Sequence, residues 1–285
     1  MSLGLDPIHR LTPHERSIPS LSQKLASDIK SLGYVIHPVI VDAKTHVIVD
    51  GTHRAEALSI LGAKFVPAYM VDYLGGDVIL ETWARLLHTR VSTDEVEALT
   101  RKHGLAIASL GSLDILVGGR PADYPLLILT GDEVLGVSGE GGRLFSLVEV
   151  LDERFKMSGL EYVMEGELLR RARGERPIAG YLIPFLEKRR VVEMAVQGIR
   201  LPPKSTRHVV VNRPMFIFCP LDLLTHPAVE AEDSLRAWVD KSRKFHLPPG
   251  MVIDRFYEEP ITVYYFEGLR HLYPAELLSR LLLGP

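Results

Sequence analysis

The residues best suited to chemistry stand at positions 50–54, where the sequence Asp-Gly-Thr-His-Arg directly follows the apolar run 47–49. Glycine lets a backbone turn sharply and lets a ligand approach it closely. If a helix begins here, its first amides point out of the helix and attract an anion, with His53 and Arg54 as additional donors. A polyphosphate fits this chemistry, and Asp50 could hold Mg²⁺ or a water of its hydration shell. An ordinary strand–helix turn with solvated polar side chains explains the same residues equally well.

A second polar cluster occupies positions 204–208, with the sequence Lys-Ser-Thr-Arg-His. It places two hydroxyls, two permanent cations and an imidazole directly before an apolar segment that predicts a strand. Such a cluster suits the phosphate of a phosphorylated product or the carboxylate of an amino acid. The preceding Pro202 and Pro203 restrict the path of the loop, which favours a binding site over a plain polar loop.

The elements that must position the first cluster follow from hydrophobic spacing and glycine stops. The spacing of Leu25, Ile29 and Leu32 predicts a helix that ends at Gly33. Apolar runs predict strands at 38–42, 46–49 and 66–71, and helical spacing predicts a helix over 52–61 that ends at Gly62. The predicted order is therefore helix, strand, strand, glycine turn, helix, strand.

The rest of the chain shows an irregular alternation of helical and strand patterns. Residues 77–104 and 152–173 have helical spacing, whereas 105–150 is rich in glycine and β-forming residues. We therefore expect a mixed α/β (α+β) protein. We expect a smaller lobe at 1–75 and a larger mixed α/β lobe at 76–285.

Three separated motifs resemble one known family. Residues 36–73 are similar to the ParB/sulfiredoxin superfamily, whose members bind nucleotide phosphates with a G-x-x-R turn at a helix start. Within it, 50–54 resembles the D-G-H-H-R turn of archaeal free L-serine kinases, although Thr52 replaces the first histidine. The segments 13–15 (Pro-His-Glu) and 201–208 (Leu-Pro-Pro-Lys-Ser-Thr-Arg-His) resemble two further motifs of these kinases in the same order.

The resemblance implies that 1–75 is a nucleotide-binding lobe and that 76–285 supplies the amino-acid site, with the site in a cleft between them. It also implies a role for each matched residue. Glu15 would be the catalytic base, Asp50 would orient His53 or a water bound to magnesium, and His53 would act in catalysis. Gly51, Thr52, His53 and Arg54 would bind the nucleotide phosphates. The amino-acid substrate would contact Trp83, Lys204, Ser205, Thr206, Arg207 and His208. Without the resemblance, Glu15 fits an exposed loop, Trp83 fits the core, and Arg54 fits an ion pair with Glu56 or another acid.

The implied activity is phosphoryl transfer from ADP or ATP to the hydroxyl of free L-serine, with Mg²⁺ required. The product, O-phospho-L-serine, would feed cysteine biosynthesis. Three alternatives were weighed: a ParB-like nucleotide-dependent DNA-binding protein, a kinase for threonine or homoserine, and a sulfiredoxin-like reductase. The last is excluded, because its chemistry needs a cysteine where this chain has Thr52.

The composition of the chain disfavours some of these alternatives. The 285 residues carry a formal net charge of -3, and Cys219 is the only cysteine. A mild acidic excess disfavours a partner such as nucleic acid, and a single cysteine excludes an intramolecular disulfide. Since no apolar run is long enough to cross a bilayer and no secretory signal is visible, we expect a cytoplasmic protein without a membrane partner. We expect a monomer or small homo-oligomer. The scarcity of Asn and Gln suggests a hyperthermophilic source, and the resemblance suggests an archaeal one.

Overall fold

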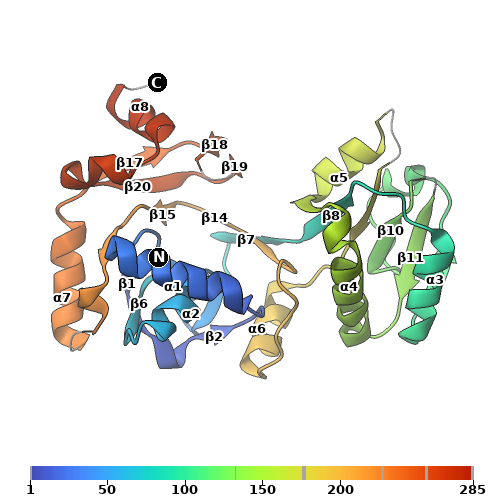
Figure 1. Ribbon diagram of the computed structural model, residues 1–285, viewed down its shortest axis with the longest axis horizontal. Coiled ribbons are helices and arrows are strands. Elements are labelled where there is room, and N and C mark those ends of the chain that lie inside the picture. Colours follow the sequence, from blue (N-terminus) through green and yellow to red (C-terminus); the bar gives the residue numbers. More distant parts are fainter. Residues whose placement is uncertain (1, 132, 175–177, 226–227, 254–255, 284–285) are drawn as a thin grey trace. The chain divides into compact units, whose positions relative to one another are not determined.

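The computed structural model describes residues 2–131, 133–174, 178–225, 228–253 and 256–283. The chain divides into two compact units, neither of which is continuous in sequence (Figure 1). Unit 1 contains 1–80, 188–200 and 208–285, and unit 2 contains 81–187 and 201–207. Each unit is described by itself.

Unit 1 is built on a mixed sheet with the strand order β1-β6-β4-β5-β2 among the described residues. The strands are β1 (Ser2–Pro7), β2 (Thr12–Pro13), β4 (Val39–Asp42), β5 (Val47–Asp50) and β6 (Phe65–Val71). Strand β5 runs antiparallel to β4 and parallel to β2, and β4 runs parallel to β6. The three predicted strands of this region are therefore confirmed, and β1 and β2 were not predicted.

Unit 1 also contains two helices that pack against each other, α1 (Pro19–Leu32) and α2 (Thr52–Ile60). Helix α1 ends at Gly33, whose φ of 77° is the left-handed conformation typical of a helix stop. Ile29 of α1 and Leu58 of α2 are both buried in the main core of unit 1. The order of elements predicted for this region is confirmed.

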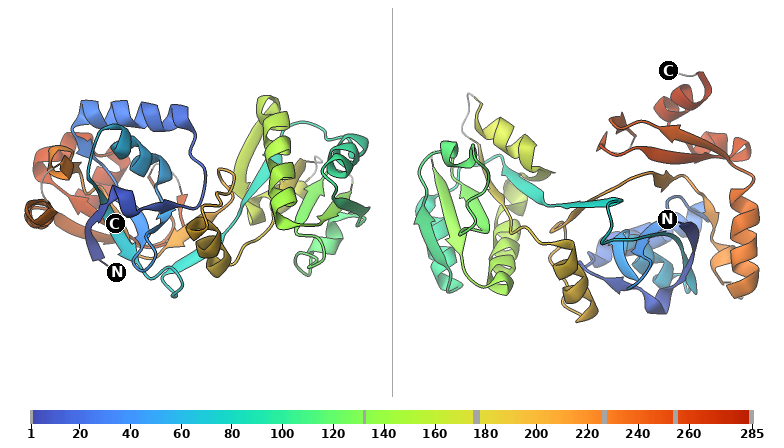
Figure 2. Two further views of the ribbon diagram at one scale, coloured as in Figure 1. Left: turned by 90° about the horizontal axis from the view of Figure 1, so that it is seen from below. Right: turned by 180° about the vertical axis from the view of Figure 1, so that it is seen from behind.

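The C-terminal third of the chain packs with the N-terminal segment. The main core of unit 1 joins buried residues from both, among them Val41, Phe218 and Val263. Figures 1 and 2 accordingly show blue and orange-red elements side by side in this unit. The sequence-based lobes, 1–75 and 76–285, separated segments that the structure places in one unit. Cys219 is buried in this core, as a small apolar residue would be.

The remaining elements of unit 1 are short. Strands β15, β20 and β17 form one sheet, whereas β3 pairs with β16 and β18 pairs with β19. Their bounds are β3 (Tyr34–Val35), β15 (Arg213–Met215), β16 (Cys219–Pro220), β17 (Arg243–Leu247), β18 (Met251–Val252), β19 (Phe256–Tyr257) and β20 (Ile261–Tyr265). The helices are α6 (Lys188–Val196), α7 (Ala228–Val239) and α8 (Ala275–Leu283).

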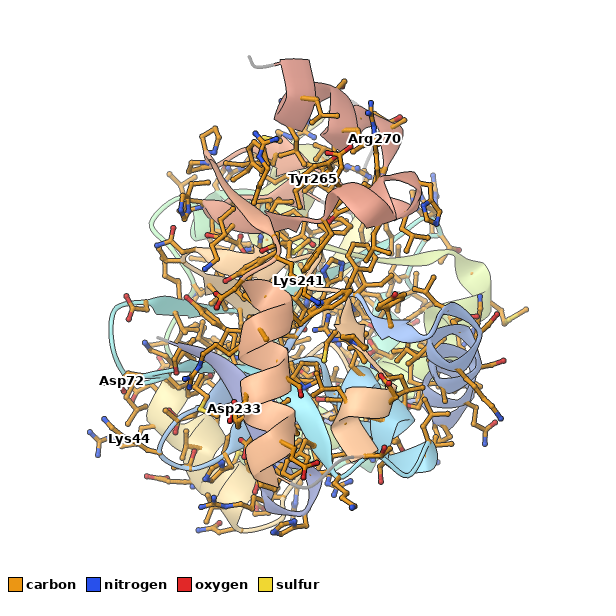
Figure 3. The ribbon with its side chains drawn as sticks, turned by 90° about the vertical axis from the view of Figure 1, so that its left-hand side faces the viewer. Lys44, Asp72, Asp233, Lys241, Tyr265 and Arg270 are labelled. Atoms are coloured by element: carbon orange, nitrogen blue, oxygen red, sulfur yellow. The ribbon has the colours of Figure 1, made fainter. Side chains whose placement is uncertain are left out.

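The outer surface of unit 1 carries charges of both signs. Figure 3 shows Asp233 on α7 and Lys241 just beyond the end of that helix, with Lys44 in the turn after β4 and Asp72 directly after β6. Lys44 Nζ donates to Asp72 Oδ1 at 3.2 Å, and both side chains are more than half exposed. Such solvated pairs contribute little to stability, so this face is an ordinary protein surface.

Unit 2 contains an antiparallel sheet with the order β12-β8-β13-β10-β11-β9 in its described part. Its strands are β8 (Trp83–Leu87), β9 (Ala106–Ser109), β10 (Leu126–Leu129), β11 (Val134–Ser138), β12 (Leu160–Met164) and β13 (Ala179–Leu182). Its helices are α3 (Thr93–Lys102), α4 (Gly141–Phe155) and α5 (Glu165–Ala172). The chain crosses between the units four times: within β7 (Val78–Glu81), after 187, after 200 and within β14 (Arg207–Val210). Strands β7 and β14 pair with each other.

Two predicted helices are wrong. Residues 77–104 contain the strands β7 and β8 before helix α3, and 152–173 contains strand β12 between the end of α4 and α5. Strand β8 lies between β12 and β13, and four of its five residues are buried. A strand buried on both faces has a continuous apolar run, which spacing alone does not distinguish from a helix. The mixed α/β class itself is confirmed.

Among the described residues, we find no helix that combines the length and the apolar character needed to cross a membrane.

Candidate active site

The register of β2 and β5 places two of the predicted site regions at one edge of the sheet. The strands are parallel, with Pro13 opposite Ile48. Glu15 and Asp50 each follow that pair by two residues, so both emerge at the carboxyl ends of neighbouring parallel strands. Ligands of α/β proteins commonly bind at such an edge. The structure therefore brings Glu15 to the phosphate-binding turn predicted at 50–54.

The turn itself depends on Gly51, which precedes the first residue of α2. Its φ is +103°, a conformation that residues with a Cβ rarely adopt. A Cβ at this position would lie 2.7 Å from Nη2 and 2.9 Å from Nε of Arg54, because the guanidinium folds back over the glycine. Gly51 thus both ends the strand and makes room for a cation at the helix N-terminus. Arg54 and the dipole of α2 together favour an anion here.

Asp50 is held by two arginines. Its Oδ2 accepts a hydrogen bond from Arg213 Nη1 and lies 3.6 Å from Arg54 Nη2. Arg213 is buried and also donates from Nε to Glu259 Oε1 at 2.9 Å and from Nη2 to the carbonyl of His208 at 2.9 Å. The ion pair considered for Arg54 is therefore formed with Asp50.

Glu56, the other acid considered for Arg54, is hydrogen-bonded elsewhere. Its Oε2 accepts from the hydroxyl of Ser22 at 2.7 Å. Hydrogen bonds from Ser17 and Ser22 lower the pKa of Glu56, so its charge is stabilised within helices α1 and α2.

His53 contacts the start of the preceding helix. Its Nε2 accepts the backbone N–H of Ile18 at 3.0 Å, directly before the first residue of α1. An imidazole nitrogen that accepts cannot carry a proton, so Nδ1 is the nitrogen that can donate. The predicted phosphate contact of His53 would therefore come from Nδ1.

Glu15 lies beside a buried histidine that the sequence analysis did not assign. The Nδ1–H of His14 donates to the carbonyl of Ile48 at 2.5 Å, and its Nε2 lies 3.7 Å from Glu15 Oε1. The side chain of Glu15 is 16% exposed and that of His14 is 5% exposed. The expected catalytic base is thus a partly buried carboxylate with an imidazole at its side.

His208 belongs to unit 1 and lies in an aromatic cluster behind this pair. Its Nε2 is 2.8 Å from the hydroxyl of Tyr73, and its ring packs edge-on against that of His14 at 5.3 Å between centroids. Burial lowers the pKa of His208 well below its ordinary range, and the nearby His14, Arg213 and Lys188 lower it further against the opposing effect of Asp50. His208 is therefore a neutral residue, which suits an anion less well than a cation would.

Tyr73 is likewise neutral. Burial raises its pKa, and the charges of Glu15 and Asp42 raise it further. The ammonium of Lys188 lies 5.9 Å from the centre of its ring and donates to the carbonyls of Gly75 and Val78. The aromatic cluster near Glu15 thus consists of uncharged rings. The nearby cation, Lys188, is held by backbone carbonyls.

The remaining predicted substrate residues gather in unit 2. Lys204 Nζ lies 5.2 Å and Arg207 Cζ 5.6 Å from the centre of the Trp83 ring, so two cations stack on one indole. Arg207 is also ion-paired with Glu81. Trp83 begins strand β8 and is only partly buried, which differs from the core role that the sequence also allowed.

The loop that carries these cations has a constrained backbone. Lys204 has a φ of 64°, which is unusual for a residue other than glycine. Its carbonyl accepts from Nη1 of Arg85 at 3.0 Å, and Arg85 is fully buried and paired through Nε and Nη2 with Asp152. Ser205, in contrast, donates its hydroxyl to the carbonyl of Pro202 at 2.8 Å, which shapes the loop. Thr206 is buried beside it.

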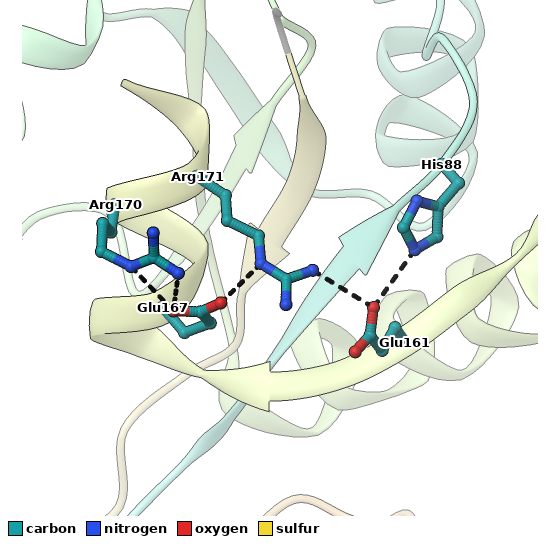
Figure 4. A network of polar contacts seen from close by, with 5 residues as sticks. All are labelled: His88, Glu161, Glu167, Arg170 and Arg171. Carbon is teal, nitrogen blue, oxygen red and sulfur yellow. Dashed lines mark hydrogen bonds and ion pairs between the residues drawn. The ribbon is translucent and has the colours of Figure 1, made fainter. Parts of the chain in front are cut away.

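A basic run on the surface of unit 2 is neutralised by carboxylates (Figure 4). Arg170 and Arg171 both donate to Glu167, and Arg171 and His88 both contact Glu161. Hydrogen bonds from the two arginines lower the pKa of Glu167. Arg170 and Arg171 therefore form ion pairs on a solvated helix face.

No metal site is evident in the described residues. They contain no group of three or more His, Cys, Asp or Glu side chains that could hold a metal ion. Asp50, the predicted magnesium ligand, has its Oδ2 engaged by Arg213 and faces Arg54. Two guanidinium groups compete with a cation for that oxygen, so Asp50 does not fit a direct metal ligand in this arrangement.

Several residues of the site were not identified from the sequence. Tyr73, Lys188, Arg213 and Glu259 reach the predicted turn or its neighbours only through the fold. The contact between Asp50 and Arg213 joins positions 163 residues apart, and no local spacing reports such a pair. Of the residues that were not identified, only His14 could have been found from the sequence, because it directly precedes Glu15 in the Pro-His-Glu motif.

The chain is similar in sequence to several known proteins. No family model matches the chain. It is 27% identical over 226 residues to an ATP-dependent L-serine kinase of Staphylothermus marinus, covering 76% of this chain and 89% of that protein. It is 29% identical over 234 residues to an ATP-dependent L-serine kinase of Desulfurococcus mucosus, with the same coverage. A ParB-like protein of Sulfolobus acidocaldarius is 27% identical over 203 residues, covering 70% of this chain and 86% of that protein.

Solved structures share the fold. A variant of a free serine kinase in complex with ADP superimposes with a TM-score of 0.66 at 21% identity, over 79% of this chain and 94% of that one. C-terminally truncated SbnI from Staphylococcus aureus gives a TM-score of 0.67 at 21% identity, over 84% and 95%. The predicted mixed α/β fold and the predicted resemblance to L-serine kinases are confirmed.

Proposed function

We propose that this protein is a free L-serine kinase, which transfers the terminal phosphate of ADP or ATP to the serine hydroxyl and forms O-phospho-L-serine. The observation that carries the proposal is the placement of Glu15 and the turn at 50–54 at the ends of neighbouring strands. The similarity to L-serine kinases over three quarters of the chain supports serine as the acceptor.

On the donor side, the terminal phosphate would lie at the N-terminus of α2. Amides of the first helical turn point toward an anion at this place, and the helix dipole adds to their attraction. Arg54 supplies a guanidinium that can bind two phosphate oxygens at once. Because Asp50 holds Arg54 from one side, the cation keeps its position over Gly51 before nucleotide arrives.

On the acceptor side, Glu15 would receive the proton of the serine hydroxyl. The serine oxygen then bonds to phosphorus as the bond between phosphorus and the leaving nucleotide breaks. Positioning and charge neutralisation supply most of the acceleration in such a reaction. The neutral Tyr73 and His208 near Glu15 suit this role, because no cation of that aromatic cluster opposes protonation of the carboxylate.

The amino-acid contacts of Trp83, Lys204, Ser205, Thr206, Arg207 and His208 stay predictions. Two observations support part of this set. Lys204 and Arg207 present two cations on one indole, which suits the serine carboxylate. The left-handed backbone of Lys204 is the kind of strain that is often found at binding sites.

The finer predictions also stay open to test. These are the choice between ADP and ATP, the requirement for Mg²⁺, the supply of cysteine biosynthesis, the cytoplasmic location, the oligomeric state and the hyperthermophilic archaeal source. For Mg²⁺, the nucleotide phosphates with their water shell would supply the ligands, since magnesium commonly binds proteins through few carboxylates.

A second candidate is a nucleotide-dependent DNA-binding protein, which the similarity to a ParB-like protein favours. The net charge of -3 and the ion pairs of Arg170 and Arg171 speak against it. Retardation of a DNA duplex that weakens with rising salt, together with absence of kinase activity, would support this candidate instead.

The test is an assay matrix with purified protein. ADP and ATP are each combined with serine, threonine and homoserine, and the phosphorylated amino acid is measured by mass spectrometry. We expect O-phosphoserine with at least one donor and weaker product from threonine, since one methyl group changes specificity by roughly 10- to 200-fold. A matrix without any phosphorylated amino acid rejects the kinase.

A single variant then tests the base. Glu15→Gln should lower kcat by roughly 10²- to 10⁴-fold, the range that a general base contributes, while nucleotide affinity stays near that of the parent. The matched control is Glu276→Gln, the same exchange at an exposed position on α8. Equal activity of the two variants would remove Glu15 from the mechanism.

A further inference from the structure

Three histidines, His14, His53 and His208, lie near the predicted reaction centre of unit 1. Each differs from the others in its hydrogen bonds and burial. His53 accepts a backbone N–H at Nε2, and His208 is buried and bonded at Nε2 to Tyr73. His14 has its Nδ1 at the carbonyl of Ile48 and its Nε2 toward Glu15. These hydrogen bonds, together with burial, determine which ring can exchange a proton with Glu15.

The contact with Ile48 determines the tautomer of His14. A carbonyl oxygen only accepts, so the 2.5 Å contact requires that Nδ1 carries the hydrogen. The only position of this ring that can gain or lose a proton is then Nε2. That atom lies 3.7 Å from Glu15 Oε1, and such contacts in catalytic sites often shorten when substrate binds.

We propose that His14 is the second proton carrier of the reaction, which takes over from Glu15 the proton of the serine hydroxyl. This inference rests on the proposed serine kinase activity. In the first step the serine O–H bond breaks, Glu15 gains the proton, and the phosphoryl group passes from the nucleotide to the serine oxygen. In the second step the proton moves from Glu15 to Nε2 of His14 and leaves an imidazolium. After product release the imidazolium gives its proton to water, and Glu15 is again a carboxylate.

The surroundings of His14 favour this assignment over the neighbouring ring. Glu15 supplies negative charge beside His14, whereas Arg213 and Lys188 oppose a charge on His208 against the attraction of Asp50. The Ile48 carbonyl stabilises the imidazolium of His14, because its hydrogen bond strengthens when the donor is charged. Burial of His208 keeps that ring neutral, so it does not compete for the proton.

His14→Asn is the decisive variant. The asparagine amide can donate to Ile48 as Nδ1–H does, but it has no atom that accepts a proton in place of Nε2. We expect kcat to fall by roughly tenfold or more, which is less than the loss in Glu15→Gln, while KM for both substrates stays unchanged. The kcat–pH profile of this variant should differ from that of the parent, because one proton-accepting group of the reaction is removed.

The control is His103→Asn in unit 2. His103 makes the same kind of bond, from Nδ1 to the carbonyl of Leu99 at 2.8 Å, at the end of α3. We expect this variant to keep the parent's kcat and pH profile. A His14→Asn enzyme with the kcat and the pH profile of the parent would overturn the proposal.

A double variant separates a shared proton path from independent effects. If His14 serves only Glu15, adding His14→Asn to Glu15→Gln lowers kcat no further. Losses that multiply would assign His14 a separate, structural effect and reject the relay. If the parent itself forms no phosphoserine, the proposed function fails; if the parent is active and His14→Asn equals it, only the relay fails.

A measurement on the intact protein covers the case in which His14→Asn does not fold. NMR of ¹⁵N-labelled histidine distinguishes the two neutral tautomers of an imidazole ring. We expect neutral His14 to carry its hydrogen on Nδ1, because that atom donates to the carbonyl of Ile48. A spectrum with the hydrogen on Nε2 would overturn the proposal, because that atom could not then accept a proton.

Discussion

Gly51→Ala tests the phosphate-binding turn most directly. Glycine at this position has a φ of +103°, and an alanine Cβ would lie 2.7 Å from Nη2 of Arg54. The exchange therefore has two separable effects: the backbone is strained, and the guanidinium is displaced from its place over the turn.

The two effects have different magnitudes and different observables. Left-handed backbone at a residue with a Cβ costs about 1–2 kcal/mol. In a domain of 150–250 residues each kcal/mol lowers Tm by roughly 2–4 °C. Loss of a hydrogen bond to a charged group is worth about 1.5–3 kcal/mol, which corresponds to a roughly 10- to 150-fold rise in Kd for nucleotide.

Gly62→Ala is the matched control, because Gly62 follows the same helix α2. It too has a positive φ, of +73°, but an added Cβ would meet nothing within 4 Å. We expect both variants to lose similar Tm in calorimetry, whereas only Gly51→Ala weakens ADP or ATP binding in titration calorimetry. If Gly51→Ala binds nucleotide as tightly as Gly62→Ala, the position of Arg54 over the turn is not its phosphate-binding position.

Three further predictions concern single side chains. Arg54→Ala should raise the nucleotide Kd by roughly 10- to 150-fold without a comparable loss of Tm, and unchanged binding would contradict the phosphate site. Lys204→Ala should raise KM for serine and leave nucleotide binding unchanged, as steady-state kinetics with each substrate varied will show; a changed nucleotide affinity would contradict its assignment to the amino acid. His208→Gln should flatten the pH dependence of stability. Because the pKa of His208 is lowered by burial, the unfolded state binds more protons below about pH 6.5, so this group destabilises the fold as pH falls, by at most about 1.4 kcal/mol per pH unit. Equal slopes of unfolding free energy against pH in parent and variant would refute a neutral, buried His208.

Local chemistry made the first half of the site predictable. The strand, glycine and helix at 47–61 follow from an apolar run, a residue that tolerates positive φ, and helical spacing. All three are properties of neighbouring residues, so a single sequence contains them. The motif at 13–15 added Glu15, and the parallel pairing of β2 with β5 explains why the two segments meet.

Long-range packing was not predictable in the same way. The division into lobes at residue 75 assumed that a compact unit is continuous, whereas residues 208–285 complete the core of unit 1. Strand β8 was predicted as part of a helix because a fully buried strand lacks the alternation that distinguishes strands. Arg85 was not identified, since a buried arginine is recognisable only from its partner Asp152.

Asp50 combines a local contact and a long-range contact in one residue. Its contact with Arg54 spans four residues along the chain, across the turn between β5 and α2. Its second partner, Arg213, comes from the C-terminal third and is shared with Glu259. Both arginines contact the same carboxylate oxygen, Oδ2, so a residue that local chemistry offers as a magnesium ligand serves in the fold as an anchor for two cations. The turn therefore presents a positive rather than a negative face to the nucleotide.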